Sequence, residues 1–304
     1  MGKWTAAAVP DLTGRTFVVT GANSGLGLES VRILAAHGAH VVLTARDRLK
    51  GEAAVAKIAQ ETPGASLELR ILDLADLESV RAFADGVRAD GLPVNVLINN
   101  AGVMMTPPRT TRQGFEMQLG TNHLGHFALT GLLLDVLAAG DDPRVVTVSS
   151  TLHKQGKIDF DDLMQTRRYS PTAAYAQSKV ANLLFGLELQ RRLTAAGSPV
   201  RSLMAHPGYS NTNLQFAGPT GWRKAIMRIA NPLMAQKPAI GALAQVRAAV
   251  APDVAGGQYY GSPKLFENRG HPELVEPSRH ARDPQVAARL WEESEKLTGV
   301  VYGV

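Results

Sequence analysis

The sequence predicts an α/β fold in which one doubly wound, mainly parallel sheet of about seven strands carries helices on both faces. Short apolar runs alternate with longer helical patterns through most of the 304 residues, as expected of a parallel sheet. A glycine-rich turn joins the first strand pattern to the first helical pattern. We find no repeat and no low-complexity linker, so we expect a single domain over residues 1–304.

Hydrophobic periodicity places the elements in order. Residues 15–20 form the first apolar run, which ends at Gly21, and a helical pattern begins within the glycine stretch. Further strands are predicted at residues 39–46, 67–73, 94–99, 144–149 and 200–205, with a short last strand at 258–260. Helices are predicted at residues 47–60, 77–88, 120–137, 172–195 and 238–251. We interpret residues from about 208 to 238 as a substrate loop or lid, and residues from about 261 to 304 as a C-terminal extension.

Composition limits the functions open to this chain. A hydrophobic fraction of 45% and a charged fraction of 19% are ordinary for a soluble enzyme. The chain has no cysteine, which excludes disulfides, thiolate metal ligands and a thiol nucleophile, and we predict no metal site. The first residues lack the apolar stretch of a secretion signal, and the longest apolar run, residues 127–134, is too short to span a bilayer. We therefore expect a cytoplasmic protein without a transmembrane segment.

The net charge of +5 is compatible with an anionic ligand. Lys and Arg residues are scattered along the chain, and no long basic run occurs. Because nucleic-acid binding normally needs a clustered basic surface, we expect a small-molecule ligand and no nucleic-acid partner.

The turn after the first predicted strand has the residues of a phosphate-binding loop. Gly21, Gly25 and Gly27 form the pattern G-x-x-x-G-x-G where a strand, a tight turn and a helix N-terminus meet. Backbone N–H groups and the helix dipole converge on a phosphate at such a junction, and a Cβ would hold the pyrophosphate away from the backbone. The spacing differs from the usual G-x-G-x-x-G fingerprint, and a glycine turn without a ligand is the alternative.

Small or polar residues also end the later strands. Asp73 ends the third strand, Asn99-Asn100-Ala101-Gly102 the fourth and Ser149-Ser150 the fifth, while Pro207-Gly208 follows the sixth. Any one of these could be ordinary turn chemistry. Together they favour a ligand site, because ligands of an open α/β sheet bind outside the carboxyl ends of its strands.

A Tyr/Lys pair lies within the predicted helix at 172–195. Tyr175 and Lys179 are four residues apart, so their side chains share one face of the helix. A phenol with an ordinary pKa of about 10 is a poor base at neutral pH, whereas a neighbouring ammonium group favours the phenolate. We expect Lys179 to lower the pKa of Tyr175 so that the pair can move a proton. A surface pair without function is the alternative.

These motifs occur in the order that marks the short-chain dehydrogenase/reductase family, which the chain resembles over about residues 12–260. The motifs are the glycine loop, Asn99-Asn100-Ala101-Gly102, Asn122, Ser150, Tyr175-x-x-x-Lys179 and Pro207-Gly208. Longer stretches at residues 20–27, 121–127 and 174–182 resemble the retinol-dehydrogenase-like branch, including its actinobacterial members. The resemblance implies a Rossmann-like fold and a nicotinamide cofactor.

The resemblance also implies a role for each site residue. Tyr175 would be the general acid/base, Lys179 would bind the nicotinamide ribose, and Ser150 would hydrogen-bond the substrate oxygen. Asn122 would hold a water that completes a proton relay to Lys179. The cofactor-binding residues would be Gly21, Asn23, Ser24, Gly25, Leu26, Gly27, Arg46, Asp73, Leu74, Asn100, Ala101, Gly102, Tyr175, Lys179, Pro207, Gly208 and Thr212. The segment between Ser150 and Tyr175 is longer than in the shortest family members, and we expect residues 156–168 to form a loop over the site.

The end of the second predicted strand indicates which cofactor is bound. NAD-binding sites usually place an acidic residue there to bind the ribose 2′-hydroxyl, whereas this chain has Ala45 followed by Arg46. In similar family members a basic residue binds the 2′-phosphate, whose geometry suits a guanidinium group. We predict NADP(H), with NAD(H) as the second choice. An Arg that merely opens the next helix is the alternative.

The segment at 209–238 indicates the substrate. It is rich in large apolar residues, and Trp222, Ile226, Ile229 and Leu233 fall at helical spacing. We interpret it as a wall around a bulky lipophilic substrate of retinoid, steroid or long-chain type. Two alternatives remain, simple packing on the sheet and peripheral contact with a membrane surface through interleaved basic residues.

The expected function is hydride transfer between NADP(H) and an alcohol/carbonyl pair, for which the protein supplies orientation and a proton. The alternative is a non-catalytic NADP(H)-binding regulatory protein on the same fold. Intact Asn122, Ser150, Tyr175 and Lys179 argue against it, because a sensor needs no proton-transfer groups. The sequence leaves open the identity of the substrate, the physiological direction and the oligomeric state, a homo-oligomer included.

Overall fold

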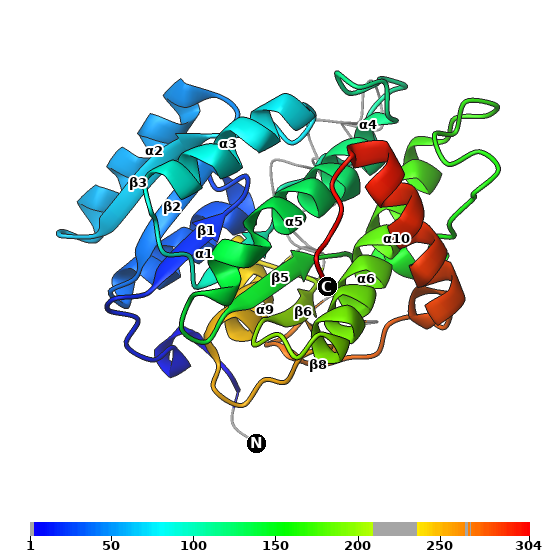
Figure 1. The fold of residues 1–304 in the computed structure, drawn as a ribbon. Coiled ribbons are helices and arrows are strands. Elements are labelled where there is room, and N and C mark those ends of the chain that lie inside the picture. Colours follow the sequence, from blue (N-terminus) through cyan, green and yellow to red (C-terminus); the bar gives the residue numbers. More distant parts are fainter. Residues whose placement is uncertain (1–2, 209–235, 265–266, 268) are drawn as a thin grey trace, which may run out of the picture.

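The computed structural model describes residues 3–208, 236–264, 267 and 269–304, which form an eight-stranded sheet with helices on both faces (Figure 1). The strand order is β3-β2-β1-β4-β5-β6-β7-β8. Strands β1 to β7 run parallel, and β8 is antiparallel to β7. The predicted fold class is confirmed, with one strand more than the seven expected.

Every predicted strand is present within one or two residues of its expected bounds. The strands are β1 Thr16–Val19, β2 His40–Ala45, β3 Ser66–Ile71, β4 Val96–Asn99, β5 Arg144–Val148, β6 Arg201–Ala205, β7 Tyr259–Gly261 and β8 Glu273–Leu274. The additional strand β8 has two residues, both exposed. It is too short to show the alternation of buried and exposed residues from which a strand is predicted.

The helices follow the predicted alternation with two differences. They are α1 Gly25–Ala36, α2 Arg48–Glu61, α3 Leu77–Ala89, α4 Met117–Leu119, α5 Gly125–Ala138, α6 Pro171–Ala195, α9 Pro238–Val250 and α10 Pro284–Thr298. Shorter helical segments are η1 Ala6–Ala8, η2 Gly120–Leu124, η3 Thr151–Gln155 and η4 His280–Arg282. The helix predicted at 120–137 is therefore α5 preceded by η2, a π-helical turn, and α10 lies where only an extension was predicted.

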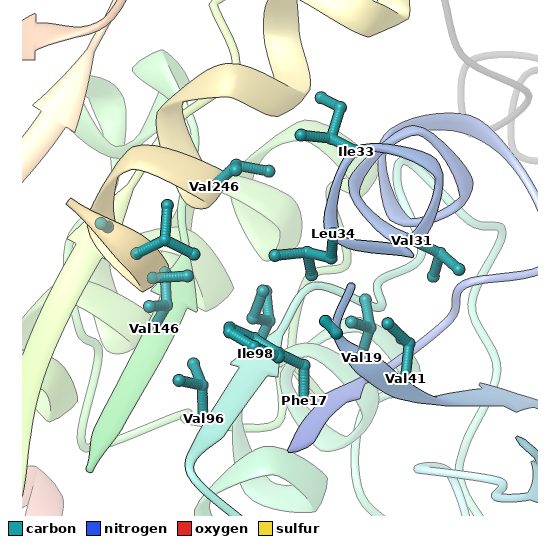
Figure 2. Packing of buried hydrophobic residues seen from close by; sticks show 14 of the residues in the cluster. Phe17, Val19, Val31, Ile33, Leu34, Val41, Val96, Ile98, Val146 and Val246 are labelled. Atoms are coloured by element: carbon teal, nitrogen blue, oxygen red, sulfur yellow. The ribbon is translucent and has the colours of Figure 1, made fainter. Parts of the chain in front are cut away.

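Alternate residues of the central strands pack on opposite faces of the sheet. Phe17 and Val19 of β1 belong to the core under α1 and α9, which also contains Leu34 of α1 and Val246 of α9 (Figure 2). Val18 belongs to the core on the other face, formed with α3, α5 and α6. Since helices cover both faces of the sheet, the ends of the strands are where polar groups can meet a ligand.

The switch point of the sheet lies between β1 and β4. Strand β1 is flanked by β2 on one side and by β4 on the other, so the loops that follow β1 and β4 are neighbours at the carboxyl edge. The amide nitrogen of Thr20 donates to the carbonyl of Ile98 at 3.0 Å, which shows how closely the two strands end together. This position is where ligands bind in open α/β sheets.

Part of the predicted lid lies outside the described residues, namely 209–235 with Thr212, Phe216 and Trp222. Over the described part of the chain, no helix is both long and apolar enough to cross a bilayer. The same part contains no group of three or more His, Asp or Glu side chains placed to hold a metal ion.

Candidate active site

A cleft opens at the carboxyl ends of β1, β2, β3 and β4. Its lining contains all the predicted cofactor-binding residues between Gly21 and Gly102, contributed by four separate loops. The lining residues are Gly21, Asn23, Ser24, Gly25, Leu26, Gly27, Thr44, Arg46, Leu72, Asp73, Leu74, Asn100, Ala101, Gly102, Val103 and Thr121. Thr44, Leu72, Val103 and Thr121 were not predicted: the first three belong to no recognised motif, and Thr121 lies in the stretch 121–127, which gave no sign that it faces the cleft. The binding role of the set stays a prediction.

Two glycines allow the loops after β1 and β4 to touch. Gly21 has a φ of +62°, and a Cβ there would lie 2.8 Å from the Cβ of Ala101. A Cβ on Gly27 would lie 2.6 Å from Nδ2 of Asn100. A side chain at either position would push the loops apart, so glycine is required at both.

The start of α1 suits a phosphate. The N-cap residue is Ser24, and its side chain makes no capping hydrogen bond. The backbone N–H groups of the first helical turn are therefore available to a ligand in the cleft, where the helix dipole favours an anion. Together with the glycine cradle, this donor set fits the pyrophosphate of a dinucleotide.

Thr20 holds the two loops in register. Its hydroxyl oxygen accepts hydrogen bonds from the backbone N–H groups of Asn100 and Ala101, each at 2.9 Å. The side-chain amide of Asn100 donates to the carbonyl of Thr20 at 2.7 Å. Thr20 is fully buried. Thr20 was not among the predicted site residues, although it lies in the stretch 20–27 that resembles the retinol-dehydrogenase-like branch, because the stretch does not show which partners its hydroxyl meets.

The predicted catalytic side chains meet beside this cleft. Tyr175 and Lys179 are buried on α6, with Nζ of Lys179 5.7 Å from the centroid of the Tyr175 ring. Ser150 follows β5 and hydrogen-bonds to Tyr175. A Cβ on Gly102 would lie 3.1 Å from Oδ1 of Asn122 and 3.7 Å from Nζ of Lys179. Asn122 and Lys179 therefore border the loop that lines the cleft.

Burial controls the protonation of the Tyr/Lys pair. Burial raises the pKa of Tyr175 to about 12, against the opposing effect of its hydrogen bond with Ser150. Burial also lowers the pKa of Lys179 to about 8. Lys179 is not among the causes of the shift in the Tyr175 pKa, because desolvation of the phenolate dominates in the protein's own groups. Tyr175 is thus a neutral phenol at physiological pH and is ready to donate a proton. The expected lowering of the Tyr175 pKa by Lys179, with oxidised nicotinamide close by, stays a prediction.

Asn122 joins the loop after β4 to α6. Its Oδ1 accepts from the backbone N–H of Val103 at 2.8 Å, and its Nδ2 donates to the carbonyl of Val103 and to Oγ of Ser178, both at 2.9 Å. The hydroxyl of Ser178 donates in turn to the carbonyl of Tyr175 at 2.8 Å. Both amide protons of Asn122 are used within the protein, so this side chain helps to position Tyr175. Its water-holding role stays a prediction.

Pro207 and Gly208 lie after β6 and are not among the residues that line the cleft. The carbonyl of Pro207 accepts from Nε2 of Gln236 at 2.6 Å, and the N–H of Gly208 donates to Nδ1 of His206 at 3.2 Å. In the segment predicted to form a loop over the site, Ile158 and its apolar neighbours pack against α6 and α10. The core thus holds this segment in place.

Comparison with known proteins assigns the family. The family model for short chain dehydrogenases matches residues 15–218. Human retinol dehydrogenase 13 is 41% identical and is aligned over 97% of this chain and 89% of its own length. Polyprenol dehydrogenase from Mus musculus is 43% identical over 98% of this chain and 88% of its own. This chain therefore belongs to the short-chain dehydrogenase family and is an oxidoreductase.

Within that family the chain falls in the retinol-dehydrogenase-like branch, as the longer sequence motifs predicted. A solved structure supports the same assignment. The crystal structure of an uncharacterised protein from Mycobacterium paratuberculosis has a TM-score of 0.82 and 47% identity, and the match covers 100% of both chains.

Proposed function

We propose that this protein transfers hydride between NADP(H) and an alcohol/carbonyl pair, with Tyr175 as the general acid/base. The observation that carries the proposal is the buried pair Tyr175 and Lys179, with the half-buried Ser150 next to Tyr175, beside a cleft shaped for a dinucleotide. The nicotinamide cofactor, when bound, supplies or accepts the hydride. The test is turnover by the purified protein with NADPH and a panel of carbonyl compounds. Cofactor binding without turnover would favour the regulatory alternative.

The chain's own residues divide the remaining tasks. The glycine loop and the N-terminus of α1 would hold the pyrophosphate, and Arg46 would hold the 2′-phosphate. The hydroxyls of Ser150 and Tyr175 would both bind the substrate oxygen. In carbonyl reduction Tyr175 would donate its phenolic proton to that oxygen, and in alcohol oxidation its phenolate would accept the hydroxyl proton.

Lys179 would stabilise the negative charge that Tyr175 acquires when it gives up its proton. The ammonium group is buried, and its Nζ donates to the carbonyl of Val148 at 3.1 Å. A charge in such surroundings acts more strongly than one in water. The same burial makes the charge of Lys179 sensitive to pH.

We expect the rate of carbonyl reduction at saturating NADPH to fall as pH rises through about 8. Lys179 is protonated below its lowered pKa and neutral above it, so the stabilising charge is present at low pH and lost at high pH. The measurement is kcat between pH 6 and 10, with Lys179→Arg as the comparison. Arg stays charged throughout this range, so the fall near pH 8 should disappear even if the variant is slower. If kcat of the Lys179→Arg enzyme still fell near pH 8, deprotonation of Lys179 would not be the cause of the fall.

We also propose that the substrate is a lipophilic alcohol or carbonyl compound of retinoid, steroid or long-chain type. Support comes from the names of the relatives, a retinol dehydrogenase and a polyprenol dehydrogenase. Each buried methylene contributes about 0.8 kcal/mol, so kcat/KM should rise about fourfold per methylene along a series of primary alcohols until the pocket is filled. The measurement is kcat/KM along that series and with retinol. Preference for small sugars or hydroxy acids would contradict the proposal.

A further inference from the structure

Two buried histidines, His123 and His126, lie in the helical segment next to Asn122, and neither has a part in the mechanism above. His123 does not line the cleft, and its Nε2 lies 2.8 Å from Oγ of Ser294 on α10. His126 lies between the end of β1 and the backbone of Asn122. Burial lowers the pKa of His123 to about 3 and that of His126 to about 4. Both rings are therefore neutral.

The hydrogen bonds of His126 fix its tautomer. Its Nδ1 lies 2.9 Å from the carbonyl oxygen of Asn122, which can only accept, so Nδ1 carries the proton. Its Nε2 is then an acceptor, and it lies 2.9 Å from Oγ1 of Thr20. That hydroxyl oxygen already accepts two backbone N–H groups. Its own proton can reach the carbonyl of Ile98 at 3.3 Å or Nε2 of His126 at 2.9 Å, and the shorter contact favours Nε2.

We infer that His126 is a positioning residue that couples the cofactor cleft to the helix carrying Tyr175. On one side its Nε2 orients the hydroxyl of Thr20, which holds the loop after β4 in place. On the other side its Nδ1–H holds the carbonyl of Asn122, whose side chain reaches α6 through Ser178. The inference rests on the proposed function, because it takes the cleft to be the cofactor site.

Two substitutions can each remove one hydrogen bond of His126 and keep the other, because its two ring nitrogens bond to different residues, Thr20 and Asn122. In His126→Asn the side-chain amide nitrogen can take the place of Nδ1, which keeps the bond to Asn122 and removes the acceptor for Thr20. In His126→Gln the amide oxygen can take the place of Nε2, which keeps the bond to Thr20 and removes the donor to Asn122. If the link to Thr20 organises the cleft, the Asn variant should bind cofactor less tightly than the Gln variant.

The experiment is a fluorescence titration of NADPH with the full-length protein, together with urea unfolding of each variant. We expect His126→Asn to raise the NADPH Kd about tenfold, as for one lost buried hydrogen bond, and His126→Gln to raise it about threefold. The matched control is His123→Asn, which breaks the bond to Ser294 within the same helical segment. It should be less stable to urea than the parent while binding NADPH equally well.

Unchanged NADPH binding by His126→Asn would overturn the inference, and so would an equal loss of binding in His123→Asn. If His126→Asn does not fold, Thr20→Val tests the hydroxyl through which His126 acts, because it nearly keeps the shape while removing the bond to His126 together with the two bonds from the backbone N–H groups. It too should raise the Kd about tenfold, and an unchanged Kd overturns the inference. A parent protein that binds neither NADPH nor NADH overturns the proposed function and the inference together, whereas a binding parent with an unaffected His126→Asn variant overturns the inference alone.

Discussion

Tyr175→Phe is expected to lower turnover by about 10²–10⁴-fold, the usual loss when a general acid is removed, while NADPH binds within about threefold of the parent. The substitution deletes one oxygen from a side chain that is 5% exposed. The phenyl ring keeps the packing of the phenol, so the fold and the cleft should persist. The reaction loses the proton donor whose neutral form burial favours. The measurement is kcat with the best substrate from the panel, alongside the NADPH Kd.

The matched control is Tyr302→Phe. Tyr302 is also buried, and its hydroxyl donates to the carbonyl of Phe127 at 2.6 Å in the core between α5 and α10. Losing this buried hydrogen bond should lower the free energy of unfolding by about 1 kcal/mol and leave turnover within a few-fold of the parent. If Tyr175→Phe turned over substrate as fast as this control, Tyr175 would not be the general acid/base.

The fold could be predicted from the sequence because its signals are local. Each central strand is a short apolar run, and each of Gly21 and Gly27 sits where a Cβ would collide with the loop after β4. The motif residues that line the cleft follow strands whose order is set by the doubly wound topology. Sequence reasoning could therefore name these residues and the edge of the sheet at which they meet.

The polar contacts inside the site could not be predicted in the same way. Thr20 and His126 are 106 positions apart, and Asn122 and Ser178 are 56 apart. No periodic pattern or short motif joins such pairs; only the packed fold does. The raised pKa of Tyr175 in the protein's own groups could not be predicted for a related reason. It depends on how fully α6 is buried, whereas the helical spacing shows only that an ammonium group is near.

Arg46 should make the protein prefer NADP(H), and its position explains why. It follows the last residue of β2 and lines the cleft together with Asn23 and Ser24 of the glycine loop. The next cations along the chain are paired, Arg48 with Glu52 at 4.0 Å and Lys50 with Asp47 at 3.5 Å. Among the described residues, no carboxylate lies within ion-pairing distance of Arg46. Its guanidinium group is thus available to a phosphate, which it can bind in a bidentate manner.

We expect the parent to bind NADPH on the order of 100-fold more tightly than NADH, and Arg46→Asp to reverse the preference. The new carboxylate would repel the 2′-phosphate and accept hydrogen bonds from the ribose 2′-hydroxyl of NADH. The measurement is the Kd of both cofactors by fluorescence titration at low and moderate salt, because an exposed ion pair is screened by salt.

Arg48→Asp is the control, since it makes the same change of charge two residues further along, at a side chain that is 67% exposed and does not line the cleft. If the preference for NADPH over NADH depends on direct contact between Arg46 and the 2′-phosphate, the Arg48→Asp variant should keep that preference. Only the salt dependence of its cofactor binding should weaken. Equal affinity of the parent for NADPH and NADH would show that Arg46 does not select the cofactor. If Arg48→Asp changed the ratio of the NADPH and NADH Kd values as much as Arg46→Asp does, the preference would come from the overall positive charge of this surface. A direct contact with the 2′-phosphate would be lost only in the variant of the residue that makes it.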